Sequence, residues 1–137
     1  VYDGATQYKI RLAGIDAPES GQAFGKRSRQ NLSELIFGKT VFVTSDKTDR
    51  YGRKVGVIRL DGVDINLKQI EAGFAWHYKQ YENEQSESER SAYAETEARA
   101  RVSQIGLWSD PKAIPPWDER TAKRSKISKA NSSNSSE

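Results

Sequence analysis

Two arginines and two carboxylates in the first 53 residues have the side chains needed for phosphate chemistry. Arg11 lies in a stretch of alternating apolar and polar residues that predicts a strand, and Asp16 and Glu19 follow it on either side of Pro18. Because proline interrupts strand pairing, the two carboxylates can face one cleft. Carboxylate oxygens suit a hard cation such as calcium, while the second carboxylate could orient or activate a water.

A second polar segment, from Thr48 to Arg53, joins two predicted strands, where loops commonly carry function. Arginine offers a planar fork that matches phosphate oxygens. If Arg11 and Arg53 met across a phosphate, they would stabilise the added charge of a pentacoordinate transition state. Tyr51, in the same segment, could stack on a base or contact a phosphate.

Periodicity and turn residues predict the elements that must position these groups. Strands are predicted at 8–15, 40–45, 53–60 and 74–78, and helices at 22–37, 66–72 and 86–104, the last being the longest. Asp61-Gly62 is a strong hairpin signal, and residues 111–117 are expected to form an extended arm that contains prolines. Short strands interrupted by helices indicate an α+β fold, a small barrel with helices attached.

Composition narrows the classes of function. The 137 residues suffice for one domain, and no apolar run approaches the roughly 20 residues of a membrane span. The absence of cysteine excludes a disulfide framework, a cysteine zinc site and a thiol nucleophile. Without methionine, residue 1 is not a translational start, and any signal peptide would precede it.

The net charge of +3 is unevenly placed along the chain. Residues 120–137 carry five basic side chains against one acid, so the rest of the chain sums to −1. Binding to nucleic acid must therefore depend on a local basic cleft and not on net charge. We predict a domain over residues 1–119 and a basic, Ser/Asn-rich tail over 120–137, in which we expect weak order.

Five motifs resemble the staphylococcal (micrococcal) nuclease family in their order and approximate spacing. They are IRLAGIDAPE, TDRYGR, DGVDINLKQIEAGFAW, ARARVSQIGLWSDP and PPWDER, and together they cover roughly residues 1–120. The resemblance implies an α+β fold built on a five-stranded OB-type β-barrel with three helices. It also implies calcium-dependent hydrolysis of the DNA and RNA backbone, with little sequence specificity and 3′-phosphate ends.

The resemblance assigns roles to individual residues of this chain. The implied site comprises catalytic Arg11, Glu19 and Arg53, metal-binding Asp16 and the backbone carbonyl of Ala17, and substrate-binding Arg50, Tyr51 and Tyr81. It further implies a monomer without a membrane partner. Secretion or a periplasmic location fits it best.

One stretch departs from the family pattern. The family usually opens with Asp-Gly-Asp-Thr, whose second aspartate binds metal, whereas this chain has Asp3-Gly4-Ala5-Thr6 and lacks the residues that normally follow. Either the chain has lost a ligand and part of a hairpin, or a mobile loop is missing between the flanks. We favour the second explanation, because residues 5–7 resemble the end of a turn entering a strand and half a hairpin would expose unpaired edges.

Structural roles compete with these functional ones. Arg11 and Glu19 could form a surface ion pair, and Asp16 could form a turn without binding metal. His77 and the three tryptophans are expected to be packing residues.

Two other classes of protein remain open. One is a catalytically impaired module on the same fold that binds nucleic acid or protein. The other is an interaction domain that docks through the proline- and tryptophan-containing arm and the basic tail.

Overall fold

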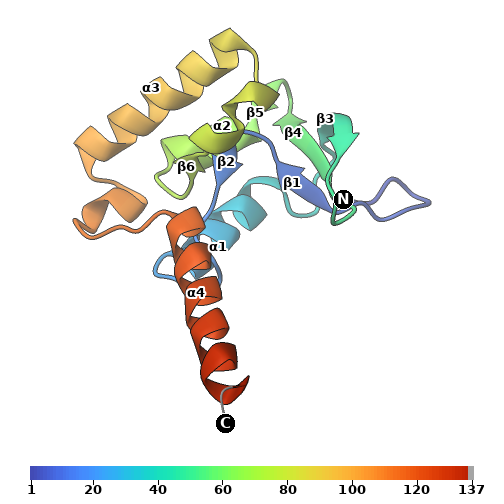
Figure 1. The fold of residues 1–137 in the computed structure, drawn as a ribbon. Helices are drawn as coiled ribbons and strands as arrows, with labels where there is room; N and C mark the ends of the chain where they lie inside the picture. The colour runs from blue at the N-terminus through green and yellow to red at the C-terminus, as the bar shows by residue number, and fades with distance from the viewer. Residues whose placement is uncertain (136–137) are drawn as a thin grey trace.

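The computed structural model describes residues 1–135, with the side-chain surroundings described as far as residue 125 (Figure 1). Its strands are β1 (Ile10–Leu12), β2 (Ile15–Asp16), β3 (Phe42–Thr48), β4 (Lys54–Leu60), β5 (Val63–Asp64) and β6 (Trp76–His77). Its α-helices are α1 (Gly25–Ile36), α2 (Ile65–Glu71), α3 (Glu87–Ser103) and α4 (Pro116–Ser135), with short 3-10 helices η1 (Lys79–Glu84) and η2 (Gly106–Ser109). The fold is therefore α+β, as predicted, with more helical elements than the three expected.

The strands form two separate sheets. β4 lies at the centre of the larger one, parallel to β1 and antiparallel to β3 and β5, while β2 pairs antiparallel with β6. The expected closed barrel of five strands is not present in residues 1–135. One reason is that the predicted strand 8–15 breaks at Gly14, whose φ of 78° suits a glycine turn, so that β2 leaves the sheet of β1 and joins β6.

The β4–β5 hairpin and the ends of helices α2 and α3 are formed by residue types that favour turns and helix caps. Asp61 and Gly62, both at positive φ, close the predicted hairpin between β4 and β5. Ser86 caps α3 by accepting a hydrogen bond from the backbone N–H of Glu89. Gly73, at a φ of 79°, directly follows the last turn of α2 and ends the helix.

The hydrophobic core lies between the sheets and helices α2 and α3, which pack on each other along the upper side of Figure 1. Its fully buried members include Ile70, Ala75 and Tyr93. Asn66, also fully buried, accepts from the backbone N–H of Ile58 and donates to the carbonyls of Ala13 and Gly56. This one amide therefore joins α2 to β4 and to the turn that follows β1.

Helix α4 is the main departure from the predicted order. We expected an extended arm as far as residue 117 and weak order from residue 120, but Pro116–Ser135 form one helix, longer than α3, that projects from the body (Figure 1). Pro116 occupies the first helical position, and Asp118 and Glu119 complement the helix dipole in the first turn. These start signals outweigh the polar composition that follows. Residues 136–137 lie outside the described residues.

The N-terminal stretch forms a continuous hairpin. Val1 and Tyr8 exchange backbone hydrogen bonds, and Asp3 Oδ1 accepts from the backbone N–H groups of Ala5 and Thr6. Residues 3–6 thus form the turn of a hairpin whose second half leads into β1, and the explanation favoured for the missing family aspartate stays a prediction. Within the described residues, no helix is both long and apolar enough to cross a membrane.

Candidate active site

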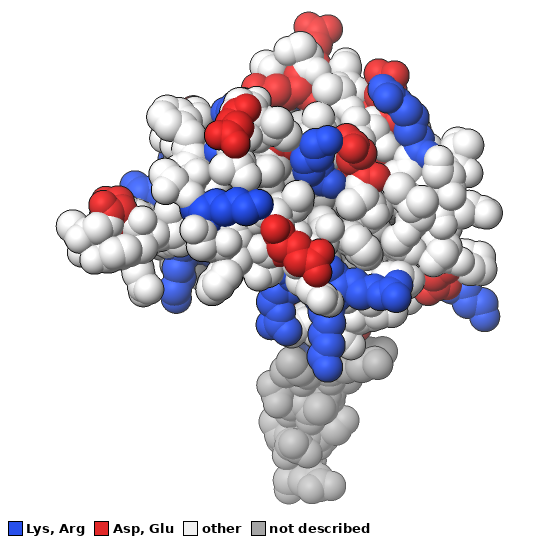
Figure 2. Space-filling view, turned by 180° about the vertical axis from the view of Figure 1, so that it is seen from behind, with Lys and Arg blue, Asp and Glu red and all other residues white. Residues whose placement is uncertain are grey.

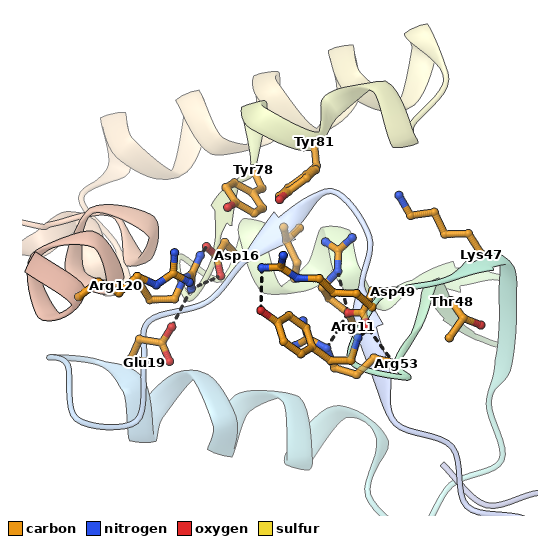
Figure 3. A pocket seen from close by; sticks show the side chains of 14 residues that line it. Arg11, Asp16, Glu19, Lys47, Thr48, Asp49, Arg53, Tyr78, Tyr81 and Arg120 are labelled. Carbon is orange, nitrogen blue, oxygen red and sulfur yellow. Dashed lines mark hydrogen bonds and ion pairs between the residues drawn. The ribbon is translucent and has the colours of Figure 1, made fainter. Parts of the chain in front are cut away.

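A polar cavity of about 690 Å³ lies where β1, β2, the β3–β4 turn, η1 and the start of α4 meet (Figure 3). The residues that line it are Arg11, Ile15, Asp16, Glu19, Lys47, Thr48, Asp49, Arg50, Tyr51, Arg53, Tyr78, Tyr81, Arg120 and Arg124. All of the predicted side-chain site residues are in this set. Ala17, predicted to contribute its carbonyl, is not, and neither is any residue of the N-terminal hairpin.

Arg11, from β1, and Arg53, the residue before β4, reach the cavity separately and meet at Asp49. Asp49 Oδ2 accepts from Arg53 Nε at 2.8 Å and lies 3.8 Å from Arg11 Nε, while its Oδ1 accepts from the backbone N–H groups of Tyr51 and Arg53 at 2.9 Å. Burial acts to raise the pKa of Asp49, but the hydrogen bonds from Arg53 and Tyr51 outweigh it and leave the pKa below its usual value. Asp49 therefore stays ionised and holds the two guanidinium groups side by side.

Glu84, at the end of η1, is a second partner of Arg11. Arg11 Nη2 donates to both Glu84 carboxylate oxygens at 3.0 Å, and Lys47 Nζ lies 2.5 Å from Glu84 Oε2. The Glu84 and Arg11 side chains are only 11% and 18% exposed, so this pair is better shielded from water than most surface ion pairs. Sequence reasoning missed Glu84, because 73 residues separate it from Arg11 and no local pattern marks it.

The two predicted carboxylates converge, as the proline break indicated. Arg120, from the first turns of α4, donates from Nη2 to Asp16 Oδ2 at 2.5 Å and from Nη1 to Asp16 Oδ1 at 3.2 Å and Glu19 Oε1 at 2.7 Å (Figure 3). Burial raises the pKa of Asp16 above its usual value, and Arg120 opposes that shift. The Asp16 side chain thus bonds to Arg120 and does not form the turn hydrogen bond considered above. Glu19 likewise pairs with Arg120, and not with Arg11 as in the surface ion pair considered above.

The chain brings Glu19 to this position through a close contact with α1. The backbone N–H of Gln22 donates to the carbonyl of Glu19 at 2.9 Å, and Gly25 starts α1 against the same carbonyl. A Cβ at Gly25 would overlap that oxygen. The glycine is therefore needed for the helix to approach the backbone that carries Glu19.

The carboxylate pair has the oxygen ligands that a hard cation prefers. Asp16 Oδ1 and Glu19 Oε1 both accept from Arg120 Nη1, so the two carboxylates face the same point of the cavity. No group of three or more acidic, histidine or cysteine side chains suited to a metal is found in the part of the chain that the structure describes. Two carboxylates completed by water and phosphate oxygens are a common cation environment in phosphate chemistry.

Aromatic side chains line the cavity beside the arginines. The Arg11 guanidinium lies 5.2 Å from the centre of the Tyr81 ring, and Tyr81 meets Tyr78 edge to face at 4.8 Å. Tyr51 is 65% exposed and accepts a hydrogen bond from Arg50 Nη2 at 2.8 Å. Arg50, Tyr51 and Tyr81 are therefore placed where a substrate could touch them, although Tyr51 also belongs to the tight turn closed by Gly52.

His77 and the tryptophans lie in packing positions. His77 is 2% exposed, contacts Gln85 through Nε2 and is not part of the cavity lining. Trp76 packs edge to face on Trp108 at 4.4 Å and on Trp117 at 5.6 Å. The structural roles expected for these residues are confirmed.

Comparison with known proteins shows which family the chain resembles in sequence. Residues 9–110 match the family described as "Staphylococcal nuclease homologue". The chain is 42% identical over 125 residues to a micrococcal nuclease of Shigella flexneri, covering 85% of this chain and 70% of that protein. It is 39% identical over 113 residues to an uncharacterized endonuclease of Haemophilus influenzae, covering 82% of this chain and 60% of that protein.

Plant proteins are similar to the same region. An uncharacterized 38.1 kDa protein of Capnoides sempervirens is 40% identical over 120 residues, which make up 88% of this chain. The chain spans only 34% of the length of that relative. The resemblance drawn from the five motifs is confirmed, and the chain belongs to the staphylococcal nuclease family.

Proposed function

We propose that this chain is a calcium-dependent nuclease that hydrolyses the phosphodiester backbone of DNA and RNA with little sequence specificity, leaving 3′-phosphate ends. The observation that carries the proposal is the convergence in one cavity of two arginines joined by Asp49 and two carboxylates joined by Arg120. This arrangement provides an anion-binding half and an acidic half at one place, as phosphodiester hydrolysis requires. The names of the nuclease relatives support the same reaction.

The anion-binding half would grip the scissile phosphate. Arg11 and Arg53 come from β1 and from the residue before β4, two strands paired in parallel, so their guanidinium groups share one side of the cavity. Their charge would stabilise the phosphate as negative charge accumulates in the transition state and the 5′ oxygen departs. Glu84 and Asp49 fix Arg11 before substrate arrives, which lowers the cost of reorganisation.

The acidic half would hold the cation and prepare the attacking water. Asp16, with the backbone carbonyl of Ala17, would bind calcium, and Glu19 would orient or deprotonate the water. A bound calcium ion would supply positive charge beside the phosphate and favour ionisation of a nearby water. This division of labour needs no contact with a base edge, which explains the weak sequence selectivity that we propose.

Substrate binding would rely on local basic groups and on stacking. On the face shown in Figure 2, lysine and arginine side chains gather where α4 leaves the body. Tyr51 and Tyr81 line the cavity with their rings partly exposed and could stack on unpaired bases. We therefore propose that the protein prefers single strands or loose duplex. We also propose that it acts as a monomer. Secretion or a periplasmic location stays a prediction.

The proposal is tested by cleavage of single-stranded DNA and RNA with calcium, with magnesium and with EDTA. Calcium-dependent cleavage that EDTA abolishes is expected, with products that a 3′-phosphatase converts to extendable ends. Products already carrying 3′-hydroxyl groups would contradict the proposed product chemistry. Cleavage that persists in EDTA would contradict the metal requirement.

A catalytically impaired module that binds nucleic acid is the second candidate. The observation that favours it is the engagement of both acidic side chains by Arg120, whose single positive charge offsets part of the negative charge of the acidic half. Retained binding of single-stranded DNA without cleavage under any cation would select this candidate. Cleavage that is lost with Arg53→Ala would exclude it.

A further inference from the structure

Arg120 bridges the two carboxylates of the cavity with an arginine fork. Nη1 and Nη2 each bond to one oxygen of Asp16, and Nη1 also bonds to Glu19. The Arg120 side chain is 31% exposed and that of Asp16 is 15% exposed, so the contact is partly shielded from solvent. Because a guanidinium stays protonated at ordinary pH, Arg120 is a permanent cation in contact with both carboxylates.

The first turn of α4 is fixed against the body, so the contact of Arg120 does not depend on a loose tail. Trp117 stacks on Tyr78 with ring centres 5.2 Å apart and an interplanar angle of 16°, and it meets Trp76 edge to face. Pro116 is fully buried. Just before the helix, the carbonyl of Ile114 accepts from Gln22 Nε2 at 2.6 Å. Arg120, one helical turn beyond Pro116, is therefore delivered to the carboxylates by an anchored element.

The same oxygens cannot satisfy a guanidinium and a divalent cation together at full strength. Asp16 and Glu19 supply two negative charges, and both are already engaged by Arg120. A divalent cation at these oxygens would face a fixed positive charge at hydrogen-bonding distance, which repels it strongly in a partly desolvated site. Binding of the cation would therefore require Arg120 to leave at least one carboxylate.

We propose that Arg120 is a built-in competitor of the divalent cation, and that the start of α4 thereby sets the cation affinity of the cavity. This inference rests on the proposed function, because it assumes that a cation binds at Asp16 and Glu19. At low calcium, Arg120 holds the carboxylates in an inactive ion-paired cluster. At high calcium, the ion displaces the guanidinium, so activity rises only above a calcium threshold that Arg120 imposes.

The test is calcium binding measured by isothermal titration calorimetry, without nucleic acid, on the whole chain. Arg120→Gln removes the competing charge and should bind calcium about tenfold more tightly than the wild type, a difference of about 1.4 kcal/mol. Arg120→Lys keeps the charge but loses the fork, so its affinity should lie between those of Arg120→Gln and the wild type. Lys123→Gln is the matched control, since it removes one positive charge from an exposed position of the same helix outside the cavity lining.

The outcomes separate failure of this inference from failure of the proposed function. Tighter binding by Arg120→Gln, with Lys123→Gln close to the wild type, supports competition. Equal tightening in Lys123→Gln, or unchanged or weaker binding in Arg120→Gln, overturns it while leaving the cation site in place. If near-ultraviolet circular dichroism shows native folds and neither the wild type nor Arg120→Gln binds calcium, the cation site itself is refuted and the inference falls with it.

Discussion

Asn66 connects the elements that carry the arginines of the site, and we predict that removing its amide destabilises the whole domain. The side chain is fully buried and makes three hydrogen bonds of 3.0–3.2 Å to backbone atoms. Two of these groups belong to β4, and the third follows β1. Asn66→Ala would therefore act on the junction that sets the distance between Arg11 and Arg53.

The size of the effect follows from the partners left behind. The carbonyl of Gly56 keeps a second donor, the backbone N–H of Ala13 at 2.9 Å, so truncation of Asn66 deprives chiefly the N–H of Ile58 and the carbonyl of Ala13. A buried group without a partner costs about 1–3 kcal/mol, so we expect a loss of roughly 3–4 kcal/mol in the free energy of unfolding. That is a large share of the roughly 5–15 kcal/mol that stabilises a typical domain.

Urea unfolding followed by tryptophan fluorescence measures this loss directly. Asn83→Ala, the same substitution at an exposed position, should change the free energy of unfolding by no more than about 0.5 kcal/mol. An Asn66→Ala protein that unfolds within about 1 kcal/mol of the wild type would refute the reasoning, since a single hydrogen bond of average strength would then account for the change.

Three further predictions concern the site and the helix that closes it. Trp117→Ala removes the ring stacked on Tyr78 and should lower the free energy of unfolding by roughly 2–4 kcal/mol in the same urea experiment; an unchanged midpoint would show that α4 is not anchored there. Asp49 has a pKa below its usual value of 3.8 in the folded chain, so its contribution to stability is complete above that value and is lost as the pH falls through the folded pKa. Asp49→Asn should therefore flatten the acid limb of a stability–pH curve, and a limb as steep as that of the wild type would contradict the assignment. Arg53→Ala should slow cleavage of single-stranded DNA by about 100-fold or more while retaining the fold. Arg59→Ala, a matched change within β4 and outside the cavity lining, should not slow it.

Most of the fold was predictable wherever local signals act alone. The predicted hairpin at Asp61 and Gly62 depends on a few adjacent residues and is confirmed. The helices predicted at 66–72 and 86–104 are also found, as α2 and α3, with each end within one residue of the prediction. The path of the strands was not predictable, because it depends on the turn at Gly14 that sends β2 to a distant partner. The prediction of weak order from residue 120 was wrong, because it relied on the polar composition there. The helix start signals at Pro116 to Glu119 were present in the sequence.

In the candidate site too, local motifs predicted some residues, whereas contacts between distant parts of the chain could not be predicted. Motifs located Arg11, Asp16, Glu19 and Arg53, which the structure brings into one cavity. Glu84 could not be found in the same way, because it lies 73 residues from Arg11 and no local pattern marks it. Arg120 ends the motif PPWDER, but its contact with Glu19, 101 residues away, depends on the fold. The contact between Arg120 of α4 and the carboxylates also joins the two sides of the domain boundary predicted after residue 119. That boundary stays a prediction.

The measurement that tests the central claim most directly is the rate of calcium-dependent cleavage of single-stranded DNA by Glu19→Gln beside the wild type. The substitution keeps the shape of the side chain and removes its ability to accept a proton, so the rate should fall by about 100-fold or more. Glu34→Gln, on the exposed face of α1, should cleave at the wild-type rate. A Glu19→Gln protein as fast as the wild type would contradict the assignment of the acidic half of the cavity and, with it, the proposed mechanism.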